Sequence, residues 1–147
     1  MSANAPVLDG LNLIARDMKA TLAFYRLLGM EIPENSVWGS GAGHHVKIDS
    51  TGSVDLELDS EGLAKAYNAA WRRPDGAGHT MIGFRVSSRQ AVDDTYTSLT
   101  NAGYSGLQEP YDAFWGSRCA IVEDPDGRNV SITSEAEDAY RSAPPEL

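Results

Sequence analysis

The sequence predicts an α+β fold in which one β-α-β unit occurs twice. Each copy begins with a strand of alternating character, continues with an amphipathic helix behind a capping residue, and ends that helix at a glycine. The first copy has its strand at 11–15, its capping residue at Asp17 and its glycine at Gly29. The second copy has its strand at 82–86, its capping residue at Ser88 and its glycine at Gly103. Residues 56–58 are echoed later by residues 130–132. The repetition indicates two modules of one plan.

The first half of the chain carries the signals of strands and two helices. The expected elements are a strand at 8–16, a helix from Asp17 to Gly29, paired strands at 30–38 and 44–48, a strand at 53–58 and a helix at 60–72. Residues 39–43, Gly-Ser-Gly-Ala-Gly, join the paired strands. This joint lacks a lysine and a following phosphate-binding helix, so we interpret it as a hairpin and not as a nucleotide loop.

The second half repeats the plan after a link at 72–76. The expected elements are a strand at 80–86, a helix at 88–102 and strands at 105–111, 117–123 and 129–133, with a turn at 124–127. The tail from Glu135 contains two prolines and is expected to be frayed or packed on a partner. We therefore expect a single domain, 1–147, made of a first module at 8–59, a connecting helix and linker at 60–78, a second module at 79–134 and a tail at 135–147.

The strands are apolar on one face and mixed in polarity on the other. In the strand at 53–58, Val54, Leu56 and Leu58 alternate with Asp55 and Glu57. The apolar face can pack on helices and form the core. The opposite face, which mixes polar and apolar residues, is what we expect where one face of a sheet lines a cleft.

Composition excludes some classes of partner. The formal net charge is −9, whereas nucleic acids and anionic membranes attract basic faces. The single cysteine, Cys119, cannot form an internal disulfide and lies in an apolar run, so a buried, inert thiol is expected. The sequence has no signal-peptide pattern and no apolar run long enough to span a membrane, so a cytoplasmic protein is expected.

Three segments, 16–30, 110–116 and 124–130, resemble the vicinal oxygen chelate superfamily, which includes glyoxalase I, bleomycin-resistance proteins and extradiol dioxygenases. The likeness covers about residues 8–134 and is nearest in character to the bleomycin-resistance-like branch. It implies two paired βαβββ modules forming a curled mixed sheet around a cleft. It also implies a homodimer with clefts at or near the interface.

The resemblance also locates the positions of the family's metal ligands. They fall on Gly10 and Glu57 in the first module and on Met81 and Ser131 in the second. Glycine has no side chain, methionine is a soft thioether and serine is a poor neutral ligand. Only Glu57 is competent, so we expect neither a metal nor another cofactor, and no catalytic residue. The alternative left open is a shifted site that uses His79, Glu57 and either His44 or His45.

Without a metal, the expected site is an aromatic and weakly polar pocket. The ligand-binding candidates are Asn12, Trp38, His45, Glu57, Met81, Tyr111, Phe114, Trp115 and Ser131, with Arg118 as a further polar group. The predicted function is metal-independent binding and sequestration of a bulky aromatic small molecule, an antibiotic or related natural product. The alternatives are a lyase or isomerase that acts through Glu57 or a shifted metal site, and a dimer whose cleft is vestigial.

Overall fold

The computed structural model describes the chain except residues 1–5, 7, 49–53, 77–79 and 147. The helices are α1 (Met18–Leu28), α2 (Glu61–Tyr67) and α3 (Arg89–Asn101), and the strands are β1 (Gly10–Ala15), β2 (His45–Ile48), β3 (Asp55–Ser60), β4 (Met81–Arg85), β5 (Gly106–Asp112), β6 (Arg118–Glu123) and β7 (Asn129–Thr133). Two 3₁₀ helices, η1 (Glu34–Ser36) and η2 (Asp138–Tyr140), complete the described elements. The chain divides into two compact units, Met1–Arg73 (unit 1) and Pro74–Leu147 (unit 2).

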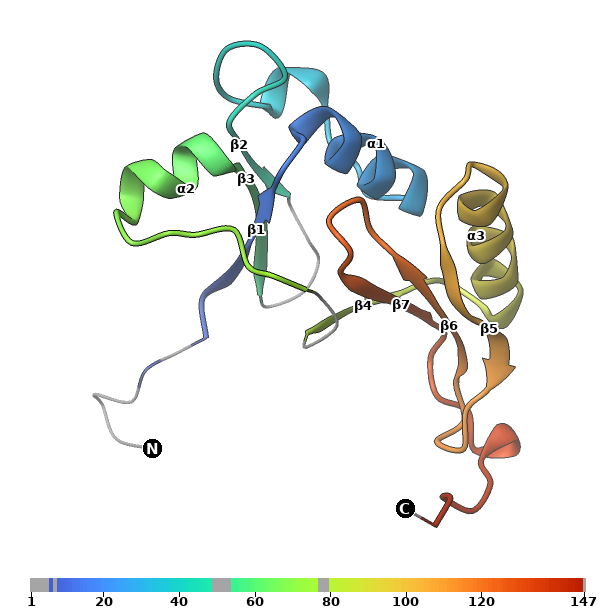
Figure 1. Cartoon of the computed structure of the whole chain (residues 1–147). Coiled ribbons are helices and arrows are strands. Elements are labelled where there is room, and N and C mark those ends of the chain that lie inside the picture. Colours follow the sequence, from blue (N-terminus) through green and yellow to red (C-terminus); the bar gives the residue numbers. More distant parts are fainter. Residues whose placement is uncertain (1–5, 7, 49–53, 77–79, 147) are drawn as a thin grey trace. The chain divides into compact units, whose positions relative to one another are not determined.

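Unit 1 holds a mixed sheet in the order β1-β3-β2, with β1 parallel and β2 antiparallel to β3. The carboxylate of Asp17 accepts the Ala20 amide hydrogen at the start of α1, and Gly29 ends the helix with φ of 117°. Helices α1 and α2 both contact β3, and Figure 1 shows them on opposite sides of this sheet. The buried side chains of Leu13, Leu58 and Tyr25 belong to its core.

Unit 2 holds a mixed sheet in the order β4-β7-β6-β5, with β4 parallel to β7 (Figure 1). Helix α3 contacts β5, β6 and β7 and buries Val92 and Leu99. The strands contribute Val122, Val130 and Ile132, all fully buried. The opposite face of this sheet carries the alternate residues, which no helix of unit 2 covers within the described residues.

The strand register confirms the internal repeat. Leu11 lies opposite Leu56 on the parallel partner in unit 1, and Ile82 lies opposite Val130 in unit 2. Strands β1, β2 and β3 therefore correspond to β4, β6 and β7. The fold is α+β with two mixed sheets, neither of them closed among the described residues, and it is consistent with paired βαβββ modules.

The strand expected at 30–38 is wrong. This segment forms η1 instead, and only Trp38 pairs with His45, as an isolated bridge. Pro33 has no amide hydrogen for a strand ladder, and its carbonyl accepts the Ser36 amide and hydroxyl hydrogens at 3.0 and 2.6 Å. Local turn bonds thus replace strand pairing.

Two further expectations are also corrected. The helix expected at 60–72 ends at Tyr67, because Asn68 leaves the helical conformation and its side chain accepts the Ala70 amide hydrogen at 3.1 Å. The tail is not frayed over 137–142. The amides of Glu137 and Ser142 donate to the carbonyls of Gly116 and Phe114, at 3.1 and 2.9 Å, so these residues pack on their own unit.

Candidate functional site

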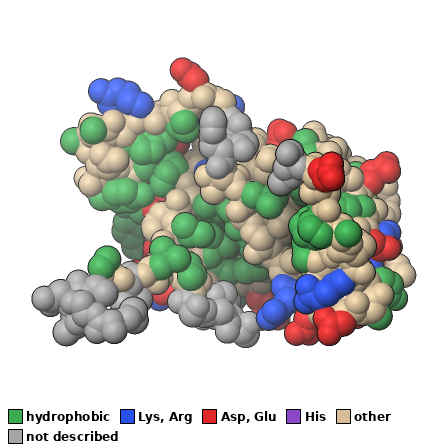
Figure 2. All heavy atoms as spheres, turned by 90° about the horizontal axis from the view of Figure 1, so that it is seen from below, with side chains coloured by type: hydrophobic (Ala, Val, Ile, Leu, Met, Phe, Trp, Pro, Cys, Tyr) green, Lys and Arg blue, Asp and Glu red, His purple; other side chains and the backbone are tan. Residues whose placement is uncertain are grey.

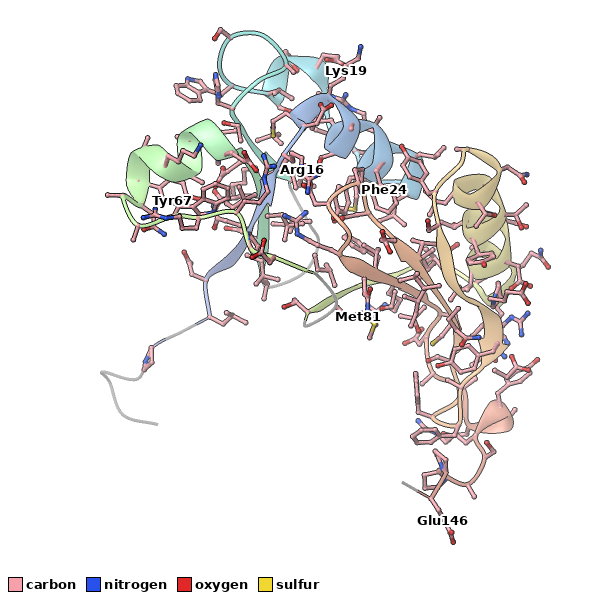
Figure 3. All side chains as sticks on the ribbon, in the orientation of Figure 1. Arg16, Lys19, Phe24, Tyr67, Met81 and Glu146 are labelled. Carbon is pink, nitrogen blue, oxygen red and sulfur yellow. The ribbon has the colours of Figure 1, made fainter. Side chains whose placement is uncertain are left out.

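The face of the unit 1 sheet that carries Glu57 gathers polar side chains from three strands. Glu57 lies opposite Asn12 on β1, and Asp59 lies opposite His45 on β2. Directly opposed residues project their side chains to the same face of a sheet. Tyr67, labelled in Figure 3, joins this group from the last residue of α2. We call these five residues, Asn12, His45, Glu57, Asp59 and Tyr67, the polar cluster.

Asp59 is the centre of the polar cluster. Its side chain is 1% exposed, and its carboxylate accepts hydrogen bonds from Asn12 Nδ2 at 2.8 Å, His45 Nδ1 at 2.6 Å and Tyr67 Oη at 3.0 Å. A buried carboxylate is stable only when such donors replace water. These contacts also hold the side chains of Asn12, His45 and Tyr67 in fixed directions.

The contact with Asp59 determines which ring nitrogen of His45 can react. A carboxylate oxygen only accepts, so Nδ1 carries the hydrogen and Nε2 keeps its lone pair in the neutral imidazole. Nε2 lies 3.9 Å from Glu57 Oε1. The pair can therefore exchange a proton with a molecule at this face, or form an ion pair when His45 is protonated.

The hydroxyl of Tyr67 is held in its neutral form. Tyr67 is 57% exposed as a residue, but partial burial of its phenol and the hydrogen bond to Asp59 raise its pKa, and the nearby charges of Asp59 and Glu57 act in the same direction. At neutral pH the hydroxyl is thus a hydrogen-bond donor and not a base.

In unit 2, Met81, Tyr111 and Ser131 lie on the sheet face opposite α3. Ser131 lies opposite Gly83 and Ile121, and Tyr111 lies opposite Cys119. Met81 is 56% exposed, and Gly83 leaves open backbone beside it. We call Met81, Gly83, Tyr111, Ile121 and Ser131 the open face; they form a largely apolar patch with two hydroxyl groups. The register places polar residues, Arg85, Glu123, Asn129 and Thr133, on the same side of the sheet around this patch.

The thiol of Cys119 and the phenol of Tyr111 lie on the strands of this face and are fully or partly shielded from solvent. The thiol of Cys119 is buried, as expected, and its sulfur lies 3.1 Å from Thr133 Oγ1. Burial of the phenol, with the nearby Cys119, raises the pKa of Tyr111, so this residue stays neutral and can donate a hydrogen bond.

The sequence has a glycine after each of two tryptophans, Trp38-Gly39 and Trp115-Gly116, but the structure does not place these tryptophans equivalently. Trp38 is 62% exposed and pairs with the residue that begins β2, whereas Trp115 pairs with Arg141 of the tail. Phe114 and Trp115 contact each other with ring centroids 5.0 Å apart. The structure therefore brings Asn12, His45 and Glu57 together, while it leaves Trp38, Phe114 and Trp115 in loops.

Arg118 is bonded to carboxylates on the α3 side of the unit 2 sheet and is not part of the open face. Its guanidinium donates to Asp93 of α3 at 3.0 and 3.3 Å and to Asp112 of β5 at 3.2 Å. The hydrogen bonds to Asp93 raise its pKa further above the ordinary value.

Sequence reasoning missed Asp59 and Tyr67. The alternation of Asp55, Glu57 and Asp59 was the signal for Asp59, since it places all three carboxylates on one face. The predicted strand ends at Leu58, two residues before the end of β3 at Ser60, and so leaves Asp59 out. No local pattern identifies Tyr67, because its role depends on where α2 lies against the sheet.

The positions of the family's metal ligands do not fit a chelate. The register confirms their pairing, because Gly10 lies opposite Asp55 as Met81 lies opposite Asn129, and Glu57 corresponds to Ser131. Among the described residues, no group of three or more His, Cys, Asp or Glu side chains has the arrangement of a metal site. His44 Nδ1 is bonded to Ser60 Oγ at 2.8 Å, and His79 of the alternative site lies outside the described residues.

Comparisons with known proteins agree with this fold. Solved structures of similar fold include a glyoxalase/bleomycin resistance protein/dioxygenase family enzyme from Burkholderia phytofirmans PsJN (22% identity, 86% of this chain and 97% of that chain, TM-score 0.69). They also include a glyoxalase-related enzyme from Fulvimarina pelagi (18% identity, 89% of this chain and 89% of that chain, TM-score 0.70). A third is TioX from Micromonospora sp. ML1 (22% identity, 88% of this chain and 98% of that chain, TM-score 0.58).

A search of the curated proteins found no significant match. A sequence model of the Glyoxalase/Bleomycin resistance protein/Dioxygenase superfamily matches residues 7–132, which is most of the chain. The chain therefore belongs to the glyoxalase/bleomycin resistance protein/dioxygenase superfamily.

Proposed function

We propose that this protein binds a bulky aromatic small molecule, an antibiotic or related natural product, and sequesters it without a metal and without turnover. The open face of unit 2 carries the proposal. A thioether at Met81 and a phenol at Tyr111 are good surfaces for a flat ring, and Ser131 can orient a polar substituent. The family's own name, which includes bleomycin resistance protein, makes a natural product the first class to test.

The first experiment is affinity recovery followed by mass spectrometry. The protein is incubated with a library of aromatic natural products and metabolites, and the bound species is eluted and weighed. Recovery at unchanged mass, with no product in solution, is the expected result. A mass change catalysed by the protein would contradict sequestration.

Substitutions then locate the bound molecule. We expect Met81→Ala to weaken binding by about 1 kcal/mol through lost sulfur–ring contact. Trp115→Ala, in the same unit, should cost about 1–3 kcal/mol if its ring also stacks on the ligand, and Trp38→Ala tests the exposed ring of unit 1 in the same way. Leu27→Ala is the matched control, because Leu27 is an exposed apolar side chain on α1. Equal affinity of the Met81→Ala and Leu27→Ala variants for the ligand would show that the ligand does not bind at the open face.

We also propose that the protein is a cytoplasmic homodimer, as the family resemblance implies. Sedimentation velocity should give twice the mass of the chain at micromolar concentration, and a monomer would contradict this part. Among the described residues, no helix has the length and apolarity needed to cross a membrane.

The polar cluster favours a second function, acid–base catalysis by a lyase or isomerase. The specific observation is the contact of His45 with buried Asp59, which leaves Nε2 3.9 Å from Glu57. In this alternative, Nε2 or the Glu57 carboxylate takes a proton from a bound carbon acid and returns it elsewhere on the same molecule. A change in the mass or isomeric form of the recovered ligand that disappears in Glu57→Gln would select this function.

A further inference from the structure

A groove in unit 1 lies between one side of α1 and the segment that follows it. The groove has a volume of about 410 Å³, within the range of small-molecule sites. On α1 it is lined by Lys19, Leu22, Ala23 and Arg26, whose spacing of three or four residues places them on one side of the helix. The other wall consists of Glu34, Val37 and residues of the glycine-rich hairpin. The groove is separate from the polar cluster.

The glycine-rich hairpin has an alternating backbone conformation. Gly39, Gly41 and Gly43 have φ of 105°, 65° and 94°, while Ser40 and Ala42 between them have negative φ. The Gly43 amide donates to the Ser40 carbonyl at 3.1 Å, whereas no backbone hydrogen bond within the described residues uses the amides of Gly41 and Ala42. These three glycines and Ala42 all line the groove.

The α1 wall supplies two cations to the same groove. Arg26 donates from Nε to the Ile32 carbonyl at 2.9 Å and pairs through Nη1 with Glu34 at 3.1 Å. Its Nη2 is buried without an acceptor among the described residues. The side chain of Glu34 is 90% exposed, so its pairing with Arg26 is weak and easily exchanged.

We propose that this groove binds the anionic group, phosphate or carboxylate, of a small molecule. The anion takes the place of Glu34 at Arg26 Nη1, and rotation of the guanidinium gives Nη2 an acceptor. A planar guanidinium binds such groups through two parallel hydrogen bonds. Lys19 adds a second positive charge from about two turns earlier on α1, and the amides of Gly41 and Ala42 complete the site. Figure 3 labels Lys19 on α1, on the side of this hairpin.

Chemical-shift titration of the full chain with inorganic phosphate, pyrophosphate and benzoate tests the proposal. The expected result is a saturable shift of the amide signals of residues 39–43 and of the Arg26 guanidinium at millimolar anion. Pyrophosphate or benzoate binding better than phosphate would identify the class of anion. No shift in these signals with any of the three anions would overturn the proposal.

Charge variants with matched controls separate this site from general attraction. Lys19→Ala should weaken binding about tenfold, as expected for a charge-assisted contact, whereas Lys65→Ala, an exposed lysine of α2, should not. Glu34→Gln should strengthen binding about threefold by freeing Arg26. Glu31→Gln makes the same change in net charge outside the groove and should leave the affinity as it is. Equal effects of each variant and its control would show adventitious binding and overturn the proposal.

Discussion

A single buried carboxylate organises the polar side of unit 1. Asp59 accepts hydrogen bonds from three elements, β1, β2 and α2, through Asn12, His45 and Tyr67. The energetic cost of burying its charge is offset by these donors. The same contacts fix the directions of Asn12, His45 and Tyr67, so the arrangement of the polar cluster depends on one residue.

Asp59→Asn should destabilise the protein by about 2 kcal/mol. The substitution replaces one accepting oxygen with an NH₂ group, so at least one of the donors Asn12, His45 and Tyr67 loses its acceptor. Denaturant unfolding measures this loss. Asp55→Asn is the control, since Asp55 lies on the same strand but is half-exposed and pairs with Lys47, and its removal should change stability by less than about 0.5 kcal/mol. Similar losses in the two variants would show that burial of Asp59 is not the cause.

The raised pKa of Tyr67 predicts a pH dependence of stability. The folded state favours the neutral phenol, so this contribution is complete below the ordinary tyrosine pKa of about 10 and is lost as pH rises through the higher folded pKa. The free energy of unfolding of the wild type should therefore fall more steeply above about pH 10 than that of Tyr67→Phe. Denaturant unfolding across this range, with Tyr140→Phe as control, measures the difference. Parallel curves for wild type and Tyr67→Phe would contradict it.

At the scale of elements, backbone conformation decides how unit 1 departs from the repeat. Where unit 2 has β5, unit 1 has η1 and a hairpin whose glycines adopt positive φ. The segment therefore forms the wall of a groove instead of an edge strand. In unit 2 the corresponding loop is covered by the tail, where the Arg89 guanidinium stacks 3.6 Å from the ring centroid of Tyr140.

Two glycine substitutions should have opposite effects on stability. Gly41→Ala should cost about 1 kcal/mol, because a side chain is strained at φ of 65° although no atom would obstruct it. Gly62→Ala in α2 should stabilise by about 0.5 kcal/mol, since its new Cβ would meet Ser60 Oγ at an ordinary 3.6 Å. Thermal unfolding compares the two. If Gly41→Ala were neutral or stabilising, the hairpin conformation would be refuted.

At the scale of the whole molecule, charge restricts the partners. The chain has 21 acidic and 12 basic residues. Figure 2 shows acidic and basic side chains close together on the face drawn, with no extended basic patch among its described side chains. A small anion can enter a local site in such a protein, whereas a polyanion meets the field of the whole molecule.

We therefore expect no binding to duplex DNA or to anionic vesicles, even at low ionic strength, where attraction to phosphates is strongest. An electrophoretic mobility assay and vesicle co-sedimentation measure this, with a basic DNA-binding protein as the positive control. Binding that weakens as salt is added would contradict the expectation.

The amino-acid sequence alone determined the repeated plan, the helix caps and the family. These features rest on short-range patterns: alternation along strands, Asp17 and Ser88 before helices, and Gly29 after one. The family resemblance implied two pairs of equivalent positions, Gly10 with Met81 and Glu57 with Ser131, and the strand register agrees with both pairs. Such signals need no knowledge of distant contacts.

Only the tertiary structure decided which side chains meet. Asn12 and His45 reach Asp59 from 47 and 14 residues away, and Lys19 joins the glycine-rich hairpin from a different element. Contacts between distant residues depend on how strands pair and helices pack, and no local sequence pattern predicts which residues will meet.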